Sequence, residues 1–132
     1  MSDRKKVLII DDEEDARTFA ETVVSEVGDF DIIMASDGTS GSQMARDTVP
    51  DLVILDVMMP GKSGFMVFND LKQDERLADM KVIMLTGVAE ERGIGFSGKD
   101  MGQYFGAEPF AFIDKPVDPR TLEDTVRSAL GV

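Results

Sequence analysis

Short apolar runs of four residues recur along the chain, and each of them ends in polar side chains. An unbroken run of this length is typical of a strand that is buried on both faces of a parallel sheet. A fifth, less regular run, Asp31–Ala35, also has the residue types of a short strand. The four clear runs are Val7–Ile10, Leu52–Leu55, Val82–Leu85 and Phe110–Ile113.

Apolar residues at helical spacing fill most of the intervals between these runs. The first helical stretch is ended by Gly28, and a weaker one is expected after the turn Ser36–Gly38. Another covers residues 64–72, and the last starts at Asp118, which can cap it, with Pro119 at its first position. The expected inward-facing residues are Ala16, Phe19, Ala20, Val23, Val24, Val27, Met44, Ala45, Phe65, Phe68, Leu71, Leu122, Val126, Ala129 and Leu130.

The alternation of strands and helices predicts an α/β fold with a parallel sheet, right-handed crossovers and helices on both faces. The irregular part is the stretch 87–106, which contains six glycines. A helix there would be weak, because each interior glycine costs up to about 1 kcal/mol relative to alanine. The size of the chain, 132 residues, predicts one domain covering 1–132.

Composition excludes several kinds of function. The net charge of −12 argues against direct binding to nucleic acid or to an anionic membrane, since both need a basic surface. The chain has no histidine and no cysteine, so His-ligated zinc, Ser-His-Asp catalysis and thiolate chemistry are excluded. Its apolar runs are too short for a signal peptide or a membrane span, so we expect a cytoplasmic protein.

Three acids follow two of the predicted strands. Asp11 and Asp12 come after the first run and Asp56 after the third strand, while Lys115 follows the last one. Because parallel strands present their carboxyl ends at one edge, these groups should meet there, with at least one carboxylate pKa raised by its like-charged neighbours. An all-oxygen site of this kind favours Mg²⁺ over Zn²⁺. An acidic first helical turn would explain the acids of Glu13–Asp15, but not Asp56.

At these positions the sequence resembles the receiver domains of two-component response regulators, over essentially its whole length. The resemblance implies a flavodoxin-like, doubly wound five-stranded parallel sheet in the order 2-1-3-4-5. The matching pieces, in order, are Ile9–Glu13, Asp56–Gly64, Thr86–Gly87 and Lys115–Pro116.

The resemblance also implies a role for each matching residue. Asp56 would be the phosphoacceptor. Mg²⁺ would be bound by Asp12, by Asp56 and by the main-chain carbonyl of Met58, with Asp11 acting mainly through a metal-bound water. Lys115 would pair with a phosphoryl oxygen.

The remaining phosphoryl oxygens would be held by the Thr86 hydroxyl and by nearby backbone amides such as that of Gly87. Thr86 and Phe112 would form the switch, Phe112 standing where tyrosine is common in the family. Phe112 lacks a hydroxyl, so we expect it to be more buried than such a tyrosine. A cis peptide bond before Pro116 is also expected.

In such a system a sensor histidine kinase or a phosphotransfer protein supplies the phosphoryl group. The face formed by the fourth helix, fifth strand and fifth helix then signals to a partner protein, and phosphorylation-dependent homodimerisation belongs to the same repertoire. The chain would not be an enzyme beyond its own phosphorylation and dephosphorylation. The interval from Thr86 to Lys115 is longer than is usual in the family, and the excess must fall in the glycine-rich stretch. This stretch, which includes residues 93–106, is therefore expected to be either a partner-specific output surface or a passive insertion.

The residues are equally compatible with a stand-alone phosphate shuttle and with one receiver domain of a longer protein. Three other functions fit them less well. An aspartyl phosphatase of the haloacid dehalogenase type needs an acid two residues after the nucleophile, where this chain has Met58. A flavodoxin-type flavin carrier needs a phosphate loop, but Asp11–Glu14 would repel phosphate. A degenerate, scaffold-only receiver would not need the full set of site residues.

Overall fold

Five parallel strands form one sheet, in the order β2-β1-β3-β4-β5, in a computed structural model that describes residues 4–87 and 109–132. Neighbouring strands are parallel in all four pairings. The predicted fold class and strand order are therefore confirmed. The strands are β1 (Lys6–Ile10), β2 (Asp31–Ala35), β3 (Leu52–Asp56), β4 (Lys81–Thr86) and β5 (Ala111–Asp114).

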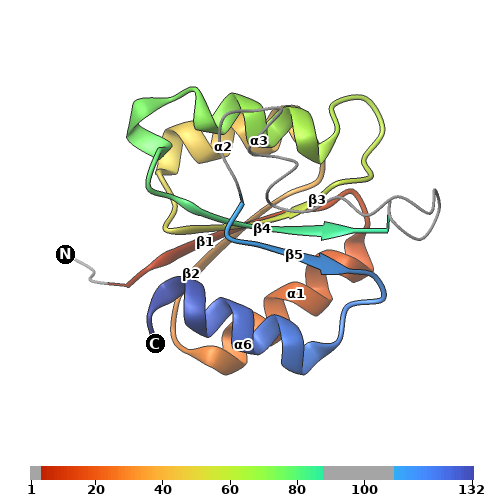
Figure 1. Cartoon of the computed structure of the whole chain (residues 1–132), viewed down its shortest axis with the longest axis vertical. Coiled ribbons are helices and arrows are strands. Elements are labelled where there is room, and N and C mark those ends of the chain that lie inside the picture. Colours follow the sequence, from red (N-terminus) through yellow and green to blue (C-terminus); the bar gives the residue numbers. More distant parts are fainter. Residues whose placement is uncertain (1–3, 88–108) are drawn as a thin grey trace.

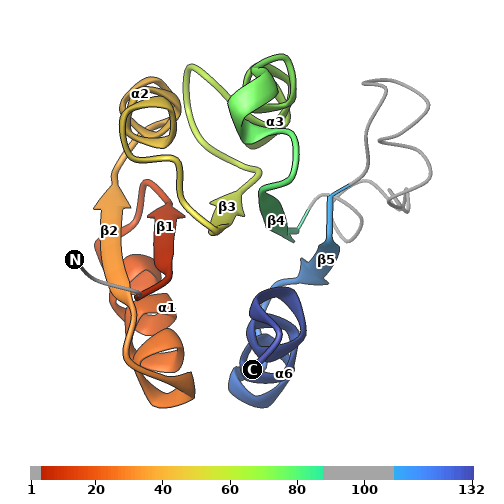
Figure 2. The same cartoon turned by 90° about the vertical axis from the view of Figure 1, so that its left-hand side faces the viewer.

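Helices cover both faces of this sheet, as Figure 1 shows with α2 and α3 on one side and α1 and α6 on the other. Figure 2 shows the same two layers in a second view. Among the described residues no helix has both the length and the apolar character needed to cross a membrane. The helices are α1 (Glu14–Val27), α2 (Gly38–Thr48), α3 (Gly64–Lys72) and α6 (Pro119–Leu130), with a short 3₁₀ helix, η1 (Glu75–Leu77).

The two layers enclose separate hydrophobic cores, because successive residues of each strand point to opposite faces. Leu8 and Ile10 of β1 pack on the side of α2 and α3, whereas Val7 and Ile9 pack on the side of α1 and α6. All four side chains are buried. Covering on both faces explains why the strands are unbroken apolar runs rather than alternating ones.

Side chains at the helix starts fix where three of the helices begin. Asp37, Ser63 and Asp118 each accept a hydrogen bond from a main-chain N–H in the first turn of α2, α3 and α6 respectively. Such caps satisfy amide groups that have no partner within the helix. The start of α1 differs, since the side chain of Glu13, its N-cap residue, makes no capping hydrogen bond.

Local details differ from the sequence-based expectations at several points, and β1 and β4 each begin one residue earlier than their apolar runs. The 3₁₀ helix η1 was not predicted; its start is held by Asp74, which accepts a hydrogen bond from the main-chain N–H of Arg76. Strand β5 begins at Ala111 rather than Phe110, whose side chain is 42% exposed. Helix α2 begins at Gly38, expected as part of a turn. The predictions for the stretch 93–106, and for the helix expected there, lie outside the described residues.

The loop between β3 and α3 depends on the absence of a side chain at Gly64. A Cβ atom added there would lie 2.3 Å from the main-chain oxygen of Asp56 and 2.7 Å from Cα of Val57. The Gly64 amide donates a hydrogen bond to the carbonyl of Val57 at 2.9 Å. The first turn of α3 therefore packs closely against the end of β3, where Asp56 is located.

Replacing Gly64 with alanine should destabilise the fold, because main-chain atoms rather than flexible side chains would have to move. We expect a loss of about 1–3 kcal/mol in the free energy of unfolding, the usual range for overpacking. Urea unfolding would measure it. Gly87→Ala is the matched control, since no atom of the described residues lies within 4 Å of a Cβ added at that position. Equal stability of the two variants would contradict the argument.

Candidate functional site

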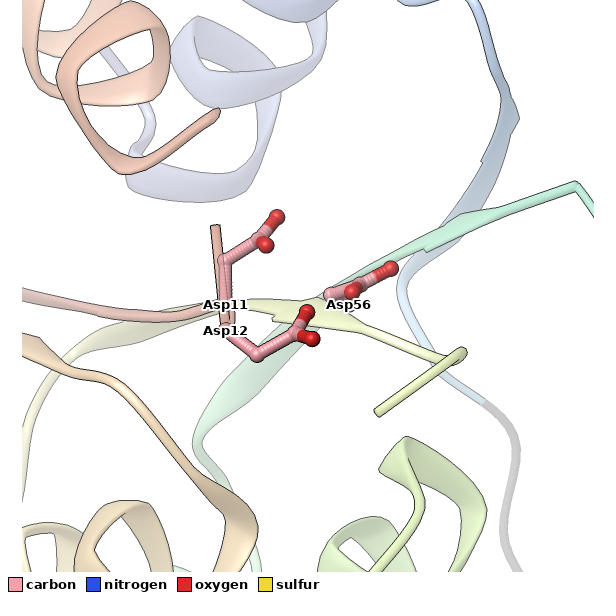
Figure 3. Close-up of side chains that lie close together, drawn as sticks. All are labelled: Asp11, Asp12 and Asp56. Carbon is pink, nitrogen blue, oxygen red and sulfur yellow. The ribbon is translucent and has the colours of Figure 1, made fainter. Parts of the chain in front are cut away.

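The carboxyl ends of β1 and β3 bring three acids together at one edge of the sheet. Asp11 and Asp12 directly follow β1, and Asp56 is the last residue of β3. One carboxylate oxygen from each of the three lies within 4.8 Å of the others. Figure 3 shows the three side chains gathered at these strand ends. The predicted convergence of the acids is therefore confirmed, and it follows from β1 and β3 being adjacent parallel strands.

Lys115 supplies a positive charge to this cluster from the end of β5. Its Nζ lies 2.8 Å from Oδ1 of Asp56 and 4.0 Å from Oδ2 of Asp11. Its main-chain N–H donates to the carbonyl of Thr86 at 2.9 Å, which extends the pairing of β5 with β4. The Lys115–Pro116 peptide bond is cis, as expected.

Two of the three acids are buried and only partly satisfied. Asp11 is 2% exposed and Asp56 is 1% exposed, while Asp12 is exposed to solvent. Within the described part of the chain, Oδ2 of Asp11 and Oδ2 of Asp56 are buried without a hydrogen-bond partner. An unpaired buried carboxylate oxygen is costly. A hard divalent cation with oxygen ligands, such as Mg²⁺, fits these donors and would remove that cost.

Burial is the main cause of the raised pKa values of Asp11 and Asp56. It raises the pKa of Asp56 to about 6, against the lowering effect of the Lys115 hydrogen bond, while the charge of Asp11 adds to the rise. Burial likewise raises the pKa of Asp11. The sequence predicts a raised carboxyl pKa, but it attributes the rise to repulsion between like charges. In Asp56 this repulsion raises the pKa less than burial does.

Burial alone would lower the pKa of Lys115, but its contacts with Asp56 and Asp11 raise this pKa above its ordinary value. The hydrogen bond to Asp56 and the charges of Asp56 and Asp11 outweigh that burial. The ammonium group therefore stays charged at neutral pH. It offsets part of the negative charge of the acids.

Asp11 is held at three of its atoms, by residues of β2, of the loop before α1 and of α1 itself. The Asp11 amide donates to the carbonyl of Ala35 at 3.2 Å, and its Oδ1 accepts from the Glu13 amide at 3.0 Å. Its carbonyl accepts a hydrogen bond from a guanidinium nitrogen of Arg17 at 2.9 Å. No sequence motif marked Arg17 as part of the site, because its contact is with the main chain and depends on how α1 leaves the loop.

The other residues predicted for the site lie on β4, on β5 and in the loops that follow β3 and β4. Thr86 ends β4 and is buried, and Gly87 follows it. Met58 lies in the loop after β3 with its side chain 46% exposed. Phe112, on β5, is partly buried against the core beneath α2 and α3, and the comparison with a tyrosine at this position stays a prediction. The roles assigned to these residues stay predictions.

A cleft of about 330 Å³ opens beside the acids, between the start of α1 and the segment after β5. Its lining combines charged residues, Asp11, Glu13, Asp15 and Lys115, with apolar groups such as Phe19, Leu85 and Val117. The acid cluster is therefore next to a space that can admit part of another molecule.

The pKa of Asp56 predicts how stability depends on pH when no metal is added. Between the ordinary value of 3.8 and about 6, the folded chain keeps a proton on Asp56 that the unfolded chain has lost. By linkage, the free energy of unfolding then falls as pH rises through this window. Above the window the folded chain carries the full cost of the buried charge, on the order of 3 kcal/mol.

Asp56→Asn should remove this cost and so stabilise the metal-free protein at neutral pH, with little effect below the window. Thermal unfolding in EDTA at both pH values measures the difference. Asp124→Asn, which removes an exposed carboxylate from α6, is the control for net charge. An Asp56→Asn protein no more stable than the unaltered chain at neutral pH would refute the expectation.

Comparisons with known proteins agree with this geometry. A family model described as the response regulator receiver domain matches residues 7–127. The chain is 35% identical over 127 residues to the protein named "Probable transcriptional regulator ycf27" of Guillardia theta, a match covering 96% of this chain and 46% of that protein. The chain thus spans about half the length of the curated relatives it matches.

Solved structures show the same likeness. The chemotaxis protein CheY4 of Vibrio cholerae is 26% identical, with a TM-score of 0.78 over 96% of this chain and 98% of that one. The receiver domain of a sensor histidine kinase from Pseudomonas aeruginosa, 17% identical, shares the fold with a TM-score of 0.79 over 98% of this chain and 99% of that one. The chain belongs to the receiver domains of the response regulators of two-component systems.

Proposed function

We propose that Asp56 accepts a phosphoryl group from a sensor histidine kinase or a phosphotransfer protein, in a reaction that depends on Mg²⁺. One observation carries the proposal. A buried carboxylate at the end of the central strand β3 has an ammonium group 2.8 Å from one oxygen and two further carboxylates close by. A structural ion pair would not need Asp12, whose exposed side chain adds negative charge to the cluster.

Asp12, Asp56 and the main-chain carbonyl of Met58 would hold the Mg²⁺ ion, with Asp11 acting through a water. The Oδ2 atoms of Asp11 and Asp56, which are buried and lack a hydrogen-bond partner among the described residues, support this assignment. So does the receiver domain of the Pseudomonas aeruginosa kinase, in which a magnesium ion is coordinated in the active site cleft. When bound, the ion would neutralise charge between the acids and the incoming phosphoryl group.

The residues of the chain would then carry out an in-line transfer. A carboxylate oxygen of Asp56 attacks phosphorus, the bond from phosphorus to the donor nitrogen breaks, and the electron pair leaves with that nitrogen. The product is an acyl phosphate on Asp56. Lys115 pairs with one phosphoryl oxygen, and the Thr86 hydroxyl and the Gly87 amide bind the others. Positioning and charge neutralisation supply most of the rate in such transfers.

The consequence of phosphorylation would be a switch rather than a catalytic cycle. Thr86 moves toward the phosphoryl group, and the ring of Phe112 turns into the space that it leaves. Beyond its own phosphorylation and dephosphorylation the domain has no enzymatic activity in this proposal, because Met58 stands where a phosphatase of the haloacid dehalogenase type needs an acid. The cytoplasmic location predicted from the sequence, and signalling through a protein partner, belong to the same proposal.

Incubation with Mg²⁺ and acetyl phosphate, followed by intact-mass measurement, tests the assignment. We expect the mass of the unaltered chain to rise by one phosphoryl group, and no rise in EDTA. Asp56→Asn should show none, because the amide cannot act as the nucleophile. Asp51→Asn, which changes an exposed aspartate before β3, should be phosphorylated like the unaltered chain. A phosphoryl group that persists in Asp56→Asn would refute the role of Asp56.

A further inference from the structure

We infer that Arg17 is a positioning residue for the metal site, because it fixes the peptide unit that joins Asp11 to Asp12. The inference rests on the proposed function, since it concerns Mg²⁺ binding by these two acids. Arg17 lies on α1, and a nitrogen of its guanidinium group donates to the main-chain oxygen of Asp11 at 2.9 Å. Among the described residues it forms no ion pair with a carboxylate of the cluster.

The position of Arg17 on the helix explains how it reaches this carbonyl. Side chains in a helix lean toward its N-terminus, and Arg17 is one turn into α1, with its amide bonded to the carbonyl of Glu13. Its side chain therefore runs back along the helix to the loop. Since Glu13 makes no side-chain capping hydrogen bond, the bond from Arg17 provides a side-chain link between the start of α1 and this loop.

Asp12 depends on this link more than Asp11 does. Asp11 is also held through its amide and through Oδ1. The side chain of Asp12 is exposed, and among the described residues no hydrogen bond to its carboxylate is found. The carbonyl of Asp11 and the amide of Asp12 belong to one planar peptide unit, so a bond that orients the first also orients the second. Arg17 thereby orients the peptide unit that ends at the Cα atom of Asp12, from which its side chain extends.

Charge and positioning have opposite effects on metal affinity here. A guanidinium group close to a cation site repels Mg²⁺, so its charge alone weakens binding. Its hydrogen bond strengthens binding by reducing the freedom of a ligand before the ion arrives. Removing an outer partner of a metal ligand commonly costs 10–100-fold in affinity, and we expect about tenfold here because the contact is to the main chain. The sign of the change therefore separates the two effects.

Isothermal titration with Mg²⁺ is the test, on the unaltered chain and on Arg17→Met, Arg17→Lys and Arg120→Met. Arg17→Met keeps a long apolar stem but loses every donor, and its Kd should rise about tenfold. Arg17→Lys keeps the charge and one donor group, and its Kd for Mg²⁺ should lie between those of Arg17→Met and the unaltered chain. Arg120→Met removes an exposed positive charge from the first turn of α6, and should leave the Kd unchanged or slightly lower.

Two further readouts distinguish positioning from a merely structural role. In the absence of metal, ¹⁵N relaxation should show a more mobile Asp12 amide in Arg17→Met, with the amides of β3 unchanged. With acetyl phosphate, the rate of phosphorylation should require more Mg²⁺ in this variant but reach the unaltered rate at saturation. Circular dichroism checks folding, and Arg17→Lys carries the test if Arg17→Met does not fold.

The outcomes separate this inference from the function on which it rests. If the unaltered chain binds no Mg²⁺, or if Asp12→Asn binds it equally well, the proposed metal site is wrong and the role of Arg17 falls with it. If Asp12→Asn loses binding while Arg17→Met binds as tightly as the unaltered chain or more tightly, the site stands and the positioning role is overturned. An unchanged Asp12 amide in the metal-free variant would also overturn it.

Discussion

The burial of two carboxylates beside a single ammonium group is the constraint that organises this molecule. Asp11 and Asp56 are almost fully withdrawn from water at the ends of adjacent strands, and Lys115 neutralises at most one negative charge. In isolation such an arrangement costs free energy. It can persist because the two hydrophobic cores on either side of the sheet hold the strand ends in place. The excess negative charge is what makes the site receptive to a cation.

Much of the fold could be predicted from the sequence, because one physical signal recurs at four of the five strands and only β2 is less regular. Residues such as Val7–Ile10 and Leu52–Leu55 are apolar without interruption, as strands covered on both faces must be. The last helix was expected to be capped by Asp118, and its side chain does cap α6. The start of β5 was placed one residue early because Phe110 is as apolar as its neighbours, although its side chain lies at the surface.

The site could be predicted only as far as it consists of side chains at strand ends. The meeting of Asp11, Asp12 and Asp56 follows from parallel topology, and all three were identified from the sequence. Contacts made through main-chain atoms cannot be recognised from the types of residue in the sequence. The bond from Arg17 to the Asp11 carbonyl, and the approach of Gly64 to the Asp56 carbonyl, depend on the path of two loops. The dominant effect of burial on the Asp56 pKa likewise required knowledge of the surrounding packing.

The distance along the chain between Asp56 and Lys115, 59 residues, affects how the protein is made. Synthesis proceeds from the N-terminus, so the segment carrying all three acids leaves the ribosome well before the lysine does. Until β5 joins the edge of the sheet, closing the first three strands would bury negative charge without its counterion. The nascent chain therefore gains the full stability of its central strands only when its last quarter has been added. Any fragment that ends before Lys115 would carry an uncompensated charge in its centre.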